Sequence, residues 1–221
     1  LVSESGTIAA NVAALDELAS GSTSLLIDPT AVGLSSSEDL AAVLEGIHLE
    51  MAGVWIFPSP RFAEIARWLL DLWDRRGVPA SDRRGGLGID PLGVAARYGT
   101  PPEFSSDLAV LVAAATDAPG VRAITVDSTP YAEAGATEAW ELAYSLATGV
   151  AYLRDLTEAG LGVDTALESL TFTYSADTNQ FTTISKLRAA RRVWDRVATA
   201  CGAEPTRRAQ TQHALTSATA L

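Results

Sequence analysis

The sequence has few of the residues that build disulfides and metal sites. Among its 221 residues are one cysteine, Cys201, and two histidines, His48 and His213. A single cysteine excludes an intrachain disulfide, and no set of ligands has the spacing of a zinc site. Cys201 falls at the end of a predicted helix, and we interpret it as a small core residue. We therefore predict no metal site in this chain.

Positive charge and long apolar runs are also scarce. The 16 lysines and arginines face 27 acidic residues, which gives a net charge of −11 and a pI of about 4.6. No basic stripe can neutralise phosphates, so we expect no nucleic-acid partner. No apolar run reaches the roughly 18 residues of a membrane-spanning helix, so we expect no membrane partner. No signal peptide is visible, and cytoplasm is the expected location, although the chain does not begin with Met.

Short apolar, β-rich segments alternate with amphipathic segments along the chain. Strands are predicted at Thr23–Ile27, Val54–Phe57, Leu87–Asp90, Arg122–Val126, Leu170–Tyr174 and Ala214–Thr216. Helices are predicted at Ser36–Ile47, Arg61–Arg76, Ser105–Thr116, Glu133–Glu158 and Asp177–Cys201. Repeated pairs of a strand and a helix favour a parallel sheet.

This alternation predicts the fold class. We expect an α/β fold in which residues 1–221 form a single partial (β/α)8 TIM-type barrel, incomplete at the N- and C-terminal ends. Six candidate strands are too few for the complete eightfold barrel. A doubly wound open sheet is the alternative. That fold usually carries a glycine-rich nucleotide loop after its first strand, and no such loop follows Ile27.

The residues after the fourth predicted strand are the most informative part of the chain. Thr129-Pro130-Tyr-Ala-Glu133-Ala-Gly-Ala136 resembles the Y-H-x-x-E-A-G-A block of the cobalamin-dependent acyl-CoA mutases, of which methylmalonyl-CoA mutase is the best-known member. The E-A-G-A half is kept. Thr129 and Pro130 stand where the family has its active-site Tyr and His, and a proline side chain cannot donate or accept a proton. We therefore predict no catalytic residue in this chain.

Further blocks carry the same resemblance in the same order. Trp140–Ala147 is similar to the family's E-L-A-Y-x-L-A helix, Lys186–Arg191 to its A-K-x-R-A-A-R helix, and His213–Ser217 to its H-x-Q-T-S strand end. The similarity extends from about Asn11 onward. Two segments, Ala14–Gly21 and Gly86–Gly93, look more like the small (β) subunits of heterodimeric members than like the large subunits.

The resemblance also indicates positions that contact substrate in the large subunits. An R-L-S strand start reads Ser169-Leu170-Thr171 here, and the Gln of H-x-Q-T-S is Leu215. His213 is the one matching position. We therefore name Ser169, Thr171 and His213 as a vestigial substrate-binding set. Neither histidine has an Asp two residues before it, as the cobalamin-ligating D-x-H-x-x-G motif requires, so we expect no cobalamin site and no C-terminal cobalamin domain in this chain.

The resemblance implies the small, non-catalytic subunit of a methylmalonyl-CoA mutase. Its role would be to stabilise a large (α) subunit that interconverts methylmalonyl-CoA and succinyl-CoA with adenosylcobalamin. Two alternatives stay open: an active barrel enzyme of the acyl-CoA mutase superfamily, and a free-standing acyl-CoA-binding module. Against the first, the titratable residues expected at strand ends are few: Asp28, Asp90, Asp127 and His213. Asp28 and Asp127 alone would make a thin site for a divalent ion.

Tryptophans suggest where a partner could bind. Trp140 and Trp194 share the apolar stripes of their predicted helices, so we expect them to pack inward, as we do Phe181 and Ile184. Trp68 falls off the stripe of its helix and is the better interface candidate.

Overall fold

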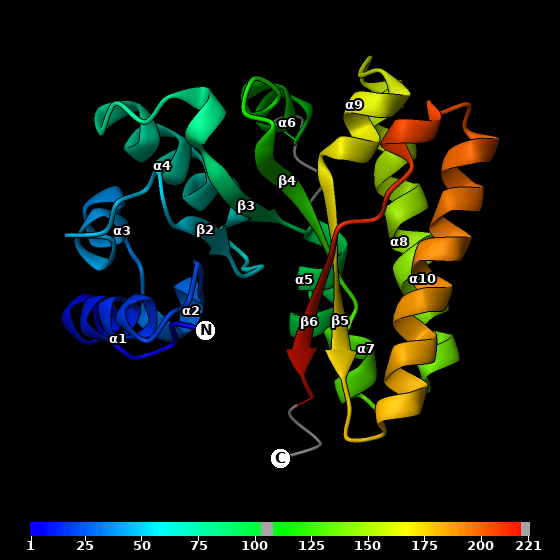
Figure 1. Ribbon diagram of the computed structural model, residues 1–221, viewed down its shortest axis with the longest axis horizontal. Helices are drawn as coiled ribbons and strands as arrows, with labels where there is room; N and C mark the ends of the chain where they lie inside the picture. Colours follow the sequence, from blue (N-terminus) through cyan, green and yellow to red (C-terminus); the bar gives the residue numbers. More distant parts are fainter. Residues whose placement is uncertain (103–107, 218–221) are drawn as a thin grey trace. The chain divides into compact units, whose positions relative to one another are not determined.

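The computed structural model describes residues 1–102 and 108–217, whose strands and helices divide between two compact units. Unit 1 comprises Leu1–Ile89 and Val110–Ile124, and unit 2 comprises Asp90–Ala109 and Thr125–Leu221. The strand β4 (Gly120–Asp127) begins in unit 1 and ends in unit 2 (Figure 1). Each unit is described by itself below.

Unit 1 contains parallel strands with helices packed on them. The strands are β1 (Ser24–Ile27), β2 (Gly53–Ile56), β3 (Arg84–Ile89) and the first part of β4. The helices are α1 (Thr7–Ala19), α2 (Pro29–Val32), α3 (Ser37–Val43), α4 (Phe62–Arg75), the 3₁₀ turn η1 (Ala80–Asp82) and most of α6 (Leu108–Ala115). The strands bury aliphatic side chains, and α4 covers them with one apolar face that ends at the fully buried Trp73.

Glycines let β3 approach β2 closely. A Cβ atom on Gly85 would lie 1.7 Å from the carbonyl oxygen of Val54, and one on Gly86 would lie 2.4 Å from the Trp55 ring. Gly85 also has φ +140 and Gly88 has φ +69, a backbone region that favours glycine. The pairing with β4 shifts its register between Gly86 and Ile89. These glycines weaken the strand signal, which is why the sequence predicts only the second half of β3.

Unit 2 contains the end of β4, β5 (Leu170–Ala176) and β6 (Gln212–Thr216). Its helices are α5 (Pro91–Tyr98), α7 (Thr129–Glu133), α8 (Glu138–Glu158), α9 (Val163–Glu168), α10 (Gln180–Ala200) and the 3₁₀ turn η2 (Pro205–Arg207). β5 and β6 are parallel, with Thr173 opposite His213. The amide of Ser128 donates to the carbonyl oxygen of Thr173 (3.1 Å), which places the end of β4 beside β5.

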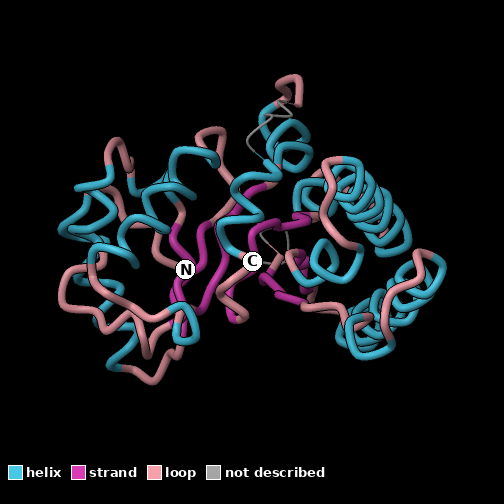
Figure 2. The backbone as a smooth tube through the Cα atoms, turned by 90° about the horizontal axis from the view of Figure 1, so that it is seen from above, coloured by secondary structure: helices cyan, strands magenta, loops and turns pink. Residues whose placement is uncertain are grey.

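The two long helices of unit 2, α8 and α10, lie side by side next to β5 (Figure 1 and Figure 2). Alternate residues of β5 divide between its faces. Phe172 and Tyr174 point toward the helices: a Cβ on Gly149 would lie 3.0 Å from the rings of Phe172 and Trp194, and Ser145 Oγ donates to Tyr174 Oη (3.0 Å). The other face of β5 carries hydroxyl side chains.

The strand order confirms the predicted class of fold. Hydrogen-bonded neighbours follow the order β1-β2-β3-β4-β5-β6, and the pairs β1–β2, β2–β3, β3–β4 and β5–β6 are parallel. A doubly wound sheet would reverse its order at a switch point. The sequential order is the one expected of consecutive barrel strands, whereas closure into an eightfold barrel stays a prediction.

Several details of the predicted helices are wrong. The predicted helix Glu133–Glu158 begins only at Glu138, as α8, because Glu133 ends the short helix α7 and the chain turns at Gly135 with φ +92. Trp140 is 59% exposed and Phe181 is 81% exposed, whereas both were expected inside. Ile184 is also exposed, and Trp194 is buried as expected. The predicted start of α6 at Ser105 lies outside the described residues. No helix in the described ranges has the length and apolar character needed to cross a membrane.

The error on α8 has a physical cause. Its buried face carries Glu141, Ser145, Gly149 and Tyr152, while Ala143 and Ala147 face solvent. These buried polar side chains have partners inside unit 2, so their burial costs little. A search for the most apolar stripe therefore selects the wrong face of this helix.

Candidate functional site

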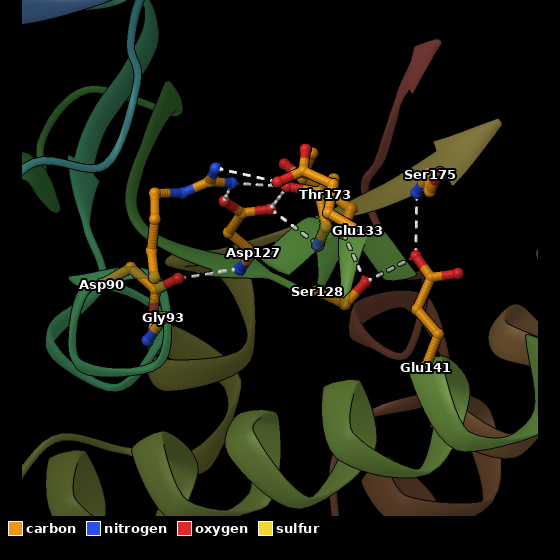
Figure 3. A network of polar contacts seen from close by, with 10 residues as sticks. Asp90, Gly93, Asp127, Ser128, Glu133, Glu141, Thr173 and Ser175 are labelled. Atoms are coloured by element: carbon orange, nitrogen blue, oxygen red, sulfur yellow. Dashed lines mark hydrogen bonds and ion pairs between the residues drawn. The ribbon is translucent and has the colours of Figure 1, made fainter. Parts of the chain in front are cut away.

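Two clusters of polar side chains, most of them buried, lie in unit 2 around Asp90 and the ends of β4 and β5; Figure 3 shows part of them. The arginine cluster consists of Asp90, Arg97, Asp127, Thr129, Glu133 and Tyr152. The lysine cluster consists of Ser128, Glu141, Ser175 and Lys186. The carboxyl ends of parallel strands are the usual location of ligand sites in α/β proteins, so these clusters are the first place to look for chemistry.

Asp90 connects three elements of the arginine cluster. One carboxylate oxygen accepts from the amide of Gly93 (2.9 Å) and from the Tyr152 hydroxyl (2.5 Å), and the other accepts from the amide of Asp127 (2.8 Å). Complete burial raises the pKa of Asp90 to about 7; the Tyr152 hydroxyl opposes this rise and the charge of Asp127 adds to it. Tyr152 Oη also accepts from the amide of Leu92 (2.8 Å). Asp90 therefore fixes the start of α5 against β4 and α8.

Asp127 holds the opposite side of the arginine cluster. Its Oδ2 lies 2.9 Å from a guanidinium nitrogen of Arg97, and its Oδ1 accepts from the amide (3.0 Å) and hydroxyl (2.7 Å) of Thr129. Arg97 also donates to Thr129 Oγ1 (2.7 Å) and pairs with Glu133 (3.2 Å). The Thr129 hydroxyl is thus used on both sides, as donor to Asp127 and as acceptor from Arg97.

A buried ion pair forms the centre of the lysine cluster. The side chains of Glu141 on α8 and Lys186 on α10 are 1% and 3% exposed and contact each other directly. Lys186 also donates to the carbonyl oxygen of Ser175 (2.7 Å), and Glu141 Oε1 accepts from the Ser175 amide (2.8 Å). Ser128 Oγ lies 3.0 Å from the same Glu141 oxygen. The pair joins both long helices to β5 and to the end of β4.

These contacts define what the clusters can do. General acid–base catalysis needs a group that can reach a substrate proton, whereas the carboxylates here are matched by cations, hydroxyls or backbone amides of the same unit. No group of three His, Cys, Asp or Glu residues that could hold a metal occurs in the described ranges. Asp28, in unit 1, caps α2 by accepting from the amides of Thr30 and Ala31. The geometry of the two clusters is that of contacts that hold the strands and helices of unit 2 together.

Comparison with known proteins identifies the family. The family model described as methylmalonyl-CoA mutase matches residues 22–221. The chain belongs to the methylmalonyl-CoA mutase family.

Individual relatives agree with this assignment. The chain is 45% identical to a methylmalonyl-CoA mutase small subunit of Streptomyces virginiae over 208 residues, which are 94% of this chain and 33% of that protein. Identity to the small subunit of Propionibacterium freudenreichii subsp. shermanii is 37%, over 93% of this chain and 32% of that protein. A methylmalonyl-CoA mutase large subunit of Porphyromonas gingivalis (strain ATCC BAA-308 / W83) is 30% identical over 78% of this chain and 25% of that protein. The chain thus spans about a third of the length of these small subunits.

The mutase-family positions predicted to bind substrate are spread over unit 2. Ser169 Oγ donates to the carbonyl oxygen of Ala166 (2.7 Å) at the start of β5. Thr171 Oγ1 is buried and has no hydrogen-bond partner among the described residues. His213 is half-buried on β6, and burial lowers its pKa. Ser169 precedes Ser175 by six residues, which is roughly 20 Å of strand. The structure therefore does not bring Ser169 to the clusters at the strand ends.

The positions that the sequence resemblance matches to the reactive Tyr and His of the family lie elsewhere in unit 2. Thr129 is in the arginine cluster, and Pro130 is half-buried in the first turn of α7. Leu215 lies on β6, two residues beyond His213. Sequence reasoning missed Arg97, Tyr152, Glu141 and Lys186 as members of the clusters. A signal for the last two was available, since both lie in the blocks that carry the family resemblance.

Proposed function

We propose that this chain is part of a non-catalytic small subunit that binds and stabilises the large subunit of a methylmalonyl-CoA mutase. The observation that carries the proposal is the end of β4, where the family resemblance puts a reactive Tyr and His. Thr129 stands there with its hydroxyl bonded to Asp127 and Arg97, and Pro130 has no proton to give. The position serves packing in this chain.

The buried charges support the same role. Asp127 is neutralised by Arg97, and Glu141 by Lys186, in contacts that connect helices to strands. A catalytic carboxylate or lysine would need to face a substrate instead. We infer that these groups hold the scaffold, and that the large subunit performs the interconversion of methylmalonyl-CoA and succinyl-CoA.

Adenosylcobalamin is implied for the complex by the family, but the residues of this chain do not fit it. His48 is 76% exposed in its side chain and lies 3.2 Å from Glu50. His213 lies on β6. Residues 46 and 211, two before these histidines, are Gly and Thr. Neither histidine has the Asp of the D-x-H-x-x-G motif, so we assign no cobalamin contact to this chain.

The proposal also covers architecture and location. We infer that both units are consecutive parts of one partial (β/α)8 barrel over residues 1–221, because their strands follow one another in order. A cytoplasmic location stays a prediction from the sequence.

Acyl-CoA binding without chemistry is the second candidate function. One observation favours it: the Thr171 hydroxyl is buried and lacks a hydrogen-bond partner among the described residues. A buried unpaired hydroxyl costs free energy, which a ligand oxygen could recover. Ser169 is satisfied by Ala166 and gives no such support.

The partnership is tested by mixing this chain with a mutase large subunit at micromolar concentrations. Size-exclusion chromatography with light scattering should give one peak with the summed mass of the two chains. Two separate peaks would contradict the proposal. The sequence-based candidate Trp68 is half-buried, with the guanidinium of Arg61 5.0 Å from its ring centre. Trp68→Ala should weaken the complex, and Trp68→Phe, which keeps an aromatic ring, should weaken it less.

The non-catalytic part of the proposal has its own test. The isolated chain, given adenosylcobalamin and methylmalonyl-CoA, should show no turnover. The double variant Thr129→Tyr with Pro130→His should stay inactive, because Ser169 and Leu215 also depart from the family's substrate-binding pattern. Turnover above the blank by the unmodified chain would overturn the assignment.

A further inference from the structure

Helix α1 of unit 1 exposes its larger apolar side chains and buries its smaller ones, which is the opposite of what is expected for a helix that only covers a core. Its large side chains face solvent: Ile8 is 83% exposed, Val12 54% and Leu15 39%. Its buried residues are the small Ala10 and Ala14, both 0% exposed. A helix normally places its larger apolar residues inward. The exposed spacing of i, i+4 and i+7 is that of a seam between two helices.

The orientation of α1 is fixed by other contacts. The side-chain amide of Asn11 donates to the carbonyl oxygens of Val43 and Glu45, both at 2.8 Å. These bonds satisfy the end of α3 and prevent α1 from rotating its large residues inward. The outward stripe is therefore a property of the folded unit.

The stripe continues into an apolar cavity. Leu15 and Leu18 of α1 form one wall, and Ile47 and Met51 contribute to the rest, of a cavity of about 390 Å³. Met51 is 74% exposed at its edge. A cavity of this kind beside a helical stripe can accept a large apolar side chain of a partner helix. The stripe and the cavity together are called the α1 surface below.

Exposed acidic residues are sequence neighbours of the α1 surface. Asp16 follows the last residue of the stripe, and Glu45 and Glu50 flank the cavity residues 46–48 and 51–52; all three are exposed. Helix α1 itself contains no Lys or Arg. Arg76 lies 3.5 Å from Glu45 and offsets part of this charge. The rim favours a partner with basic flanks and disfavours a second copy of this chain, whose net charge is also −11.

The alignment with a small subunit begins before the family model does. The family model begins at residue 22, after α1. The alignment with the Streptomyces virginiae small subunit spans 208 of the 221 residues, so at most 13 residues lie outside it. At least eight of the first 21 residues therefore lie inside that alignment. The aligned region therefore includes residues 14–21, which contain Leu15 and Leu18 of the α1 surface.

We propose that the α1 surface docks an amphipathic helix of the large subunit, with an apolar seam along Ile8, Val12 and Leu15 and with Lys or Arg on its flanks. The inference rests on the proposed partnership and adds the surface that carries it. An apolar side chain of the incoming helix fills the cavity, and its basic residues face Asp16, Glu45 and Glu50.

The test measures the affinity of the large subunit for matched variants. Val12→Glu places a charge in the stripe, and Ala9→Glu places the same charge on an exposed position of α1 outside the stripe. Val12→Glu should weaken binding at least tenfold by calorimetry, and Ala9→Glu less than threefold. Ile8→Glu serves as the second stripe variant. Circular dichroism and thermal melting check that every variant remains folded.

The outcomes separate this inference from the proposed function. No complex with the unmodified chain overturns the partnership and this surface with it. A complex that both Val12→Glu and Ile8→Glu leave intact overturns the surface alone. Self-association of the chain that Val12→Glu abolishes, with unchanged binding of the large subunit, would assign the surface to a second copy and also overturn the proposal. Weakening by both stripe variants, combined with weaker binding at high salt, supports it.

Discussion

Unit 1 and unit 2 are stabilised in different ways. Among the described residues, the buried polar side chain of unit 1 is Ser59, and its core is otherwise aliphatic and aromatic. The buried polar side chains of unit 2 are Asp90, Thr125, Asp127, Ser128, Thr129, Glu141, Ser145, Ser169, Thr171, Thr173, Ser175, Lys186, Gln210 and Ser217. The core of unit 1 is therefore held together by the packing of apolar side chains, and the core of unit 2 also by hydrogen bonds and ion pairs between buried polar groups.

This difference determines what the loss of one side chain does in each unit. In an apolar core a lost side chain leaves a cavity, whereas in a polar core it leaves an unmatched charge or an unpaired donor. Unit 2 holds the buried pair of Glu141 and Lys186, and Thr129 and Pro130 stand where the sequence resemblance puts the reactive Tyr and His of the family. We infer that the polar core persists because removing any one member is costly.

The largest expected effect comes from breaking the buried ion pair of unit 2. Glu141→Ala leaves Lys186 as an unpaired buried charge and leaves the amide of Ser175 without its acceptor. Removing one partner of a buried pair costs roughly 3–5 kcal/mol, so the free energy of unfolding should fall by about that amount. Urea denaturation followed by circular dichroism measures this change.

Matched variants show whether the pairing itself is responsible. Lys186→Met should cost a similar amount, whereas Arg192→Met, on the exposed side of the same helix, should change stability by less than about 0.5 kcal/mol. The double variant Glu141→Ala with Lys186→Met should be less destabilised than the two single losses added together. Additive losses would show that the two side chains do not act as a pair.

The second effect tests unit 1, where the close packing of β2 against β3 is expected to determine stability. Gly85→Ala would bring a Cβ to 1.7 Å from the Val54 carbonyl oxygen at φ +140. Strain and displacement of β2 should cost about 3 kcal/mol. Gly33→Ala is the control, because Gly33 has φ +80 with nothing within 4 Å of the added carbon. It should cost about 1 kcal/mol from the backbone alone. Equal losses would mean that the close approach of β2 and β3 is unimportant.

The same contrast explains what the sequence could and could not predict. The strands β1, β2, β4 and β5 were found because segments rich in aliphatic, aromatic and β-branched residues are a direct signal of a buried strand. The buried face of α8 was missed because Glu141 and Ser145 look solvent-exposed until their partners are known. The break at Gly135 was also missed, since the apolar pattern continues across it. Contacts such as Arg97 with Asp127 join residues 30 positions apart and require the fold itself.

A third effect is a pH dependence located in unit 2. Burial raises the pKa of Asp90 from 3.8 to about 7. A carboxyl with a raised folded pKa contributes stability that is fully present below the unfolded value and is lost as pH rises through about 7. Asp90→Asn removes this titration. Between pH 5 and 7 the variant should gain stability relative to the unmodified chain, by up to about 1.4 kcal/mol per pH unit.

Urea denaturation at pH 5, 6, 7 and 8 and constant ionic strength measures the difference. Asp90→Asn should be the less stable protein at pH 5, where Asp90 is protonated, because an amide nitrogen cannot accept a hydrogen bond whereas both oxygens of a carboxyl group can. The difference should then shrink toward pH 7. Parallel pH curves for the two proteins would show that Asp90 does not titrate in this range.

The smallest effect compares one unpaired hydroxyl from each unit. Ser59 Oγ in unit 1 and Thr171 Oγ1 in unit 2 are buried without a hydrogen-bond partner among the described residues. Ser59→Ala and Thr171→Val remove these hydroxyls with little change of shape. Because an unsatisfied buried hydroxyl is unfavourable, each variant should gain about 1 kcal/mol of unfolding free energy. If Thr171 retains a role in holding an acyl-CoA, Thr171→Val should also weaken acyl-CoA binding in calorimetry, whereas Ser59→Ala should leave it unchanged. Equal acyl-CoA affinities of the two variants would show that the Thr171 hydroxyl does not contact this ligand. The observation that favours acyl-CoA binding would then be removed.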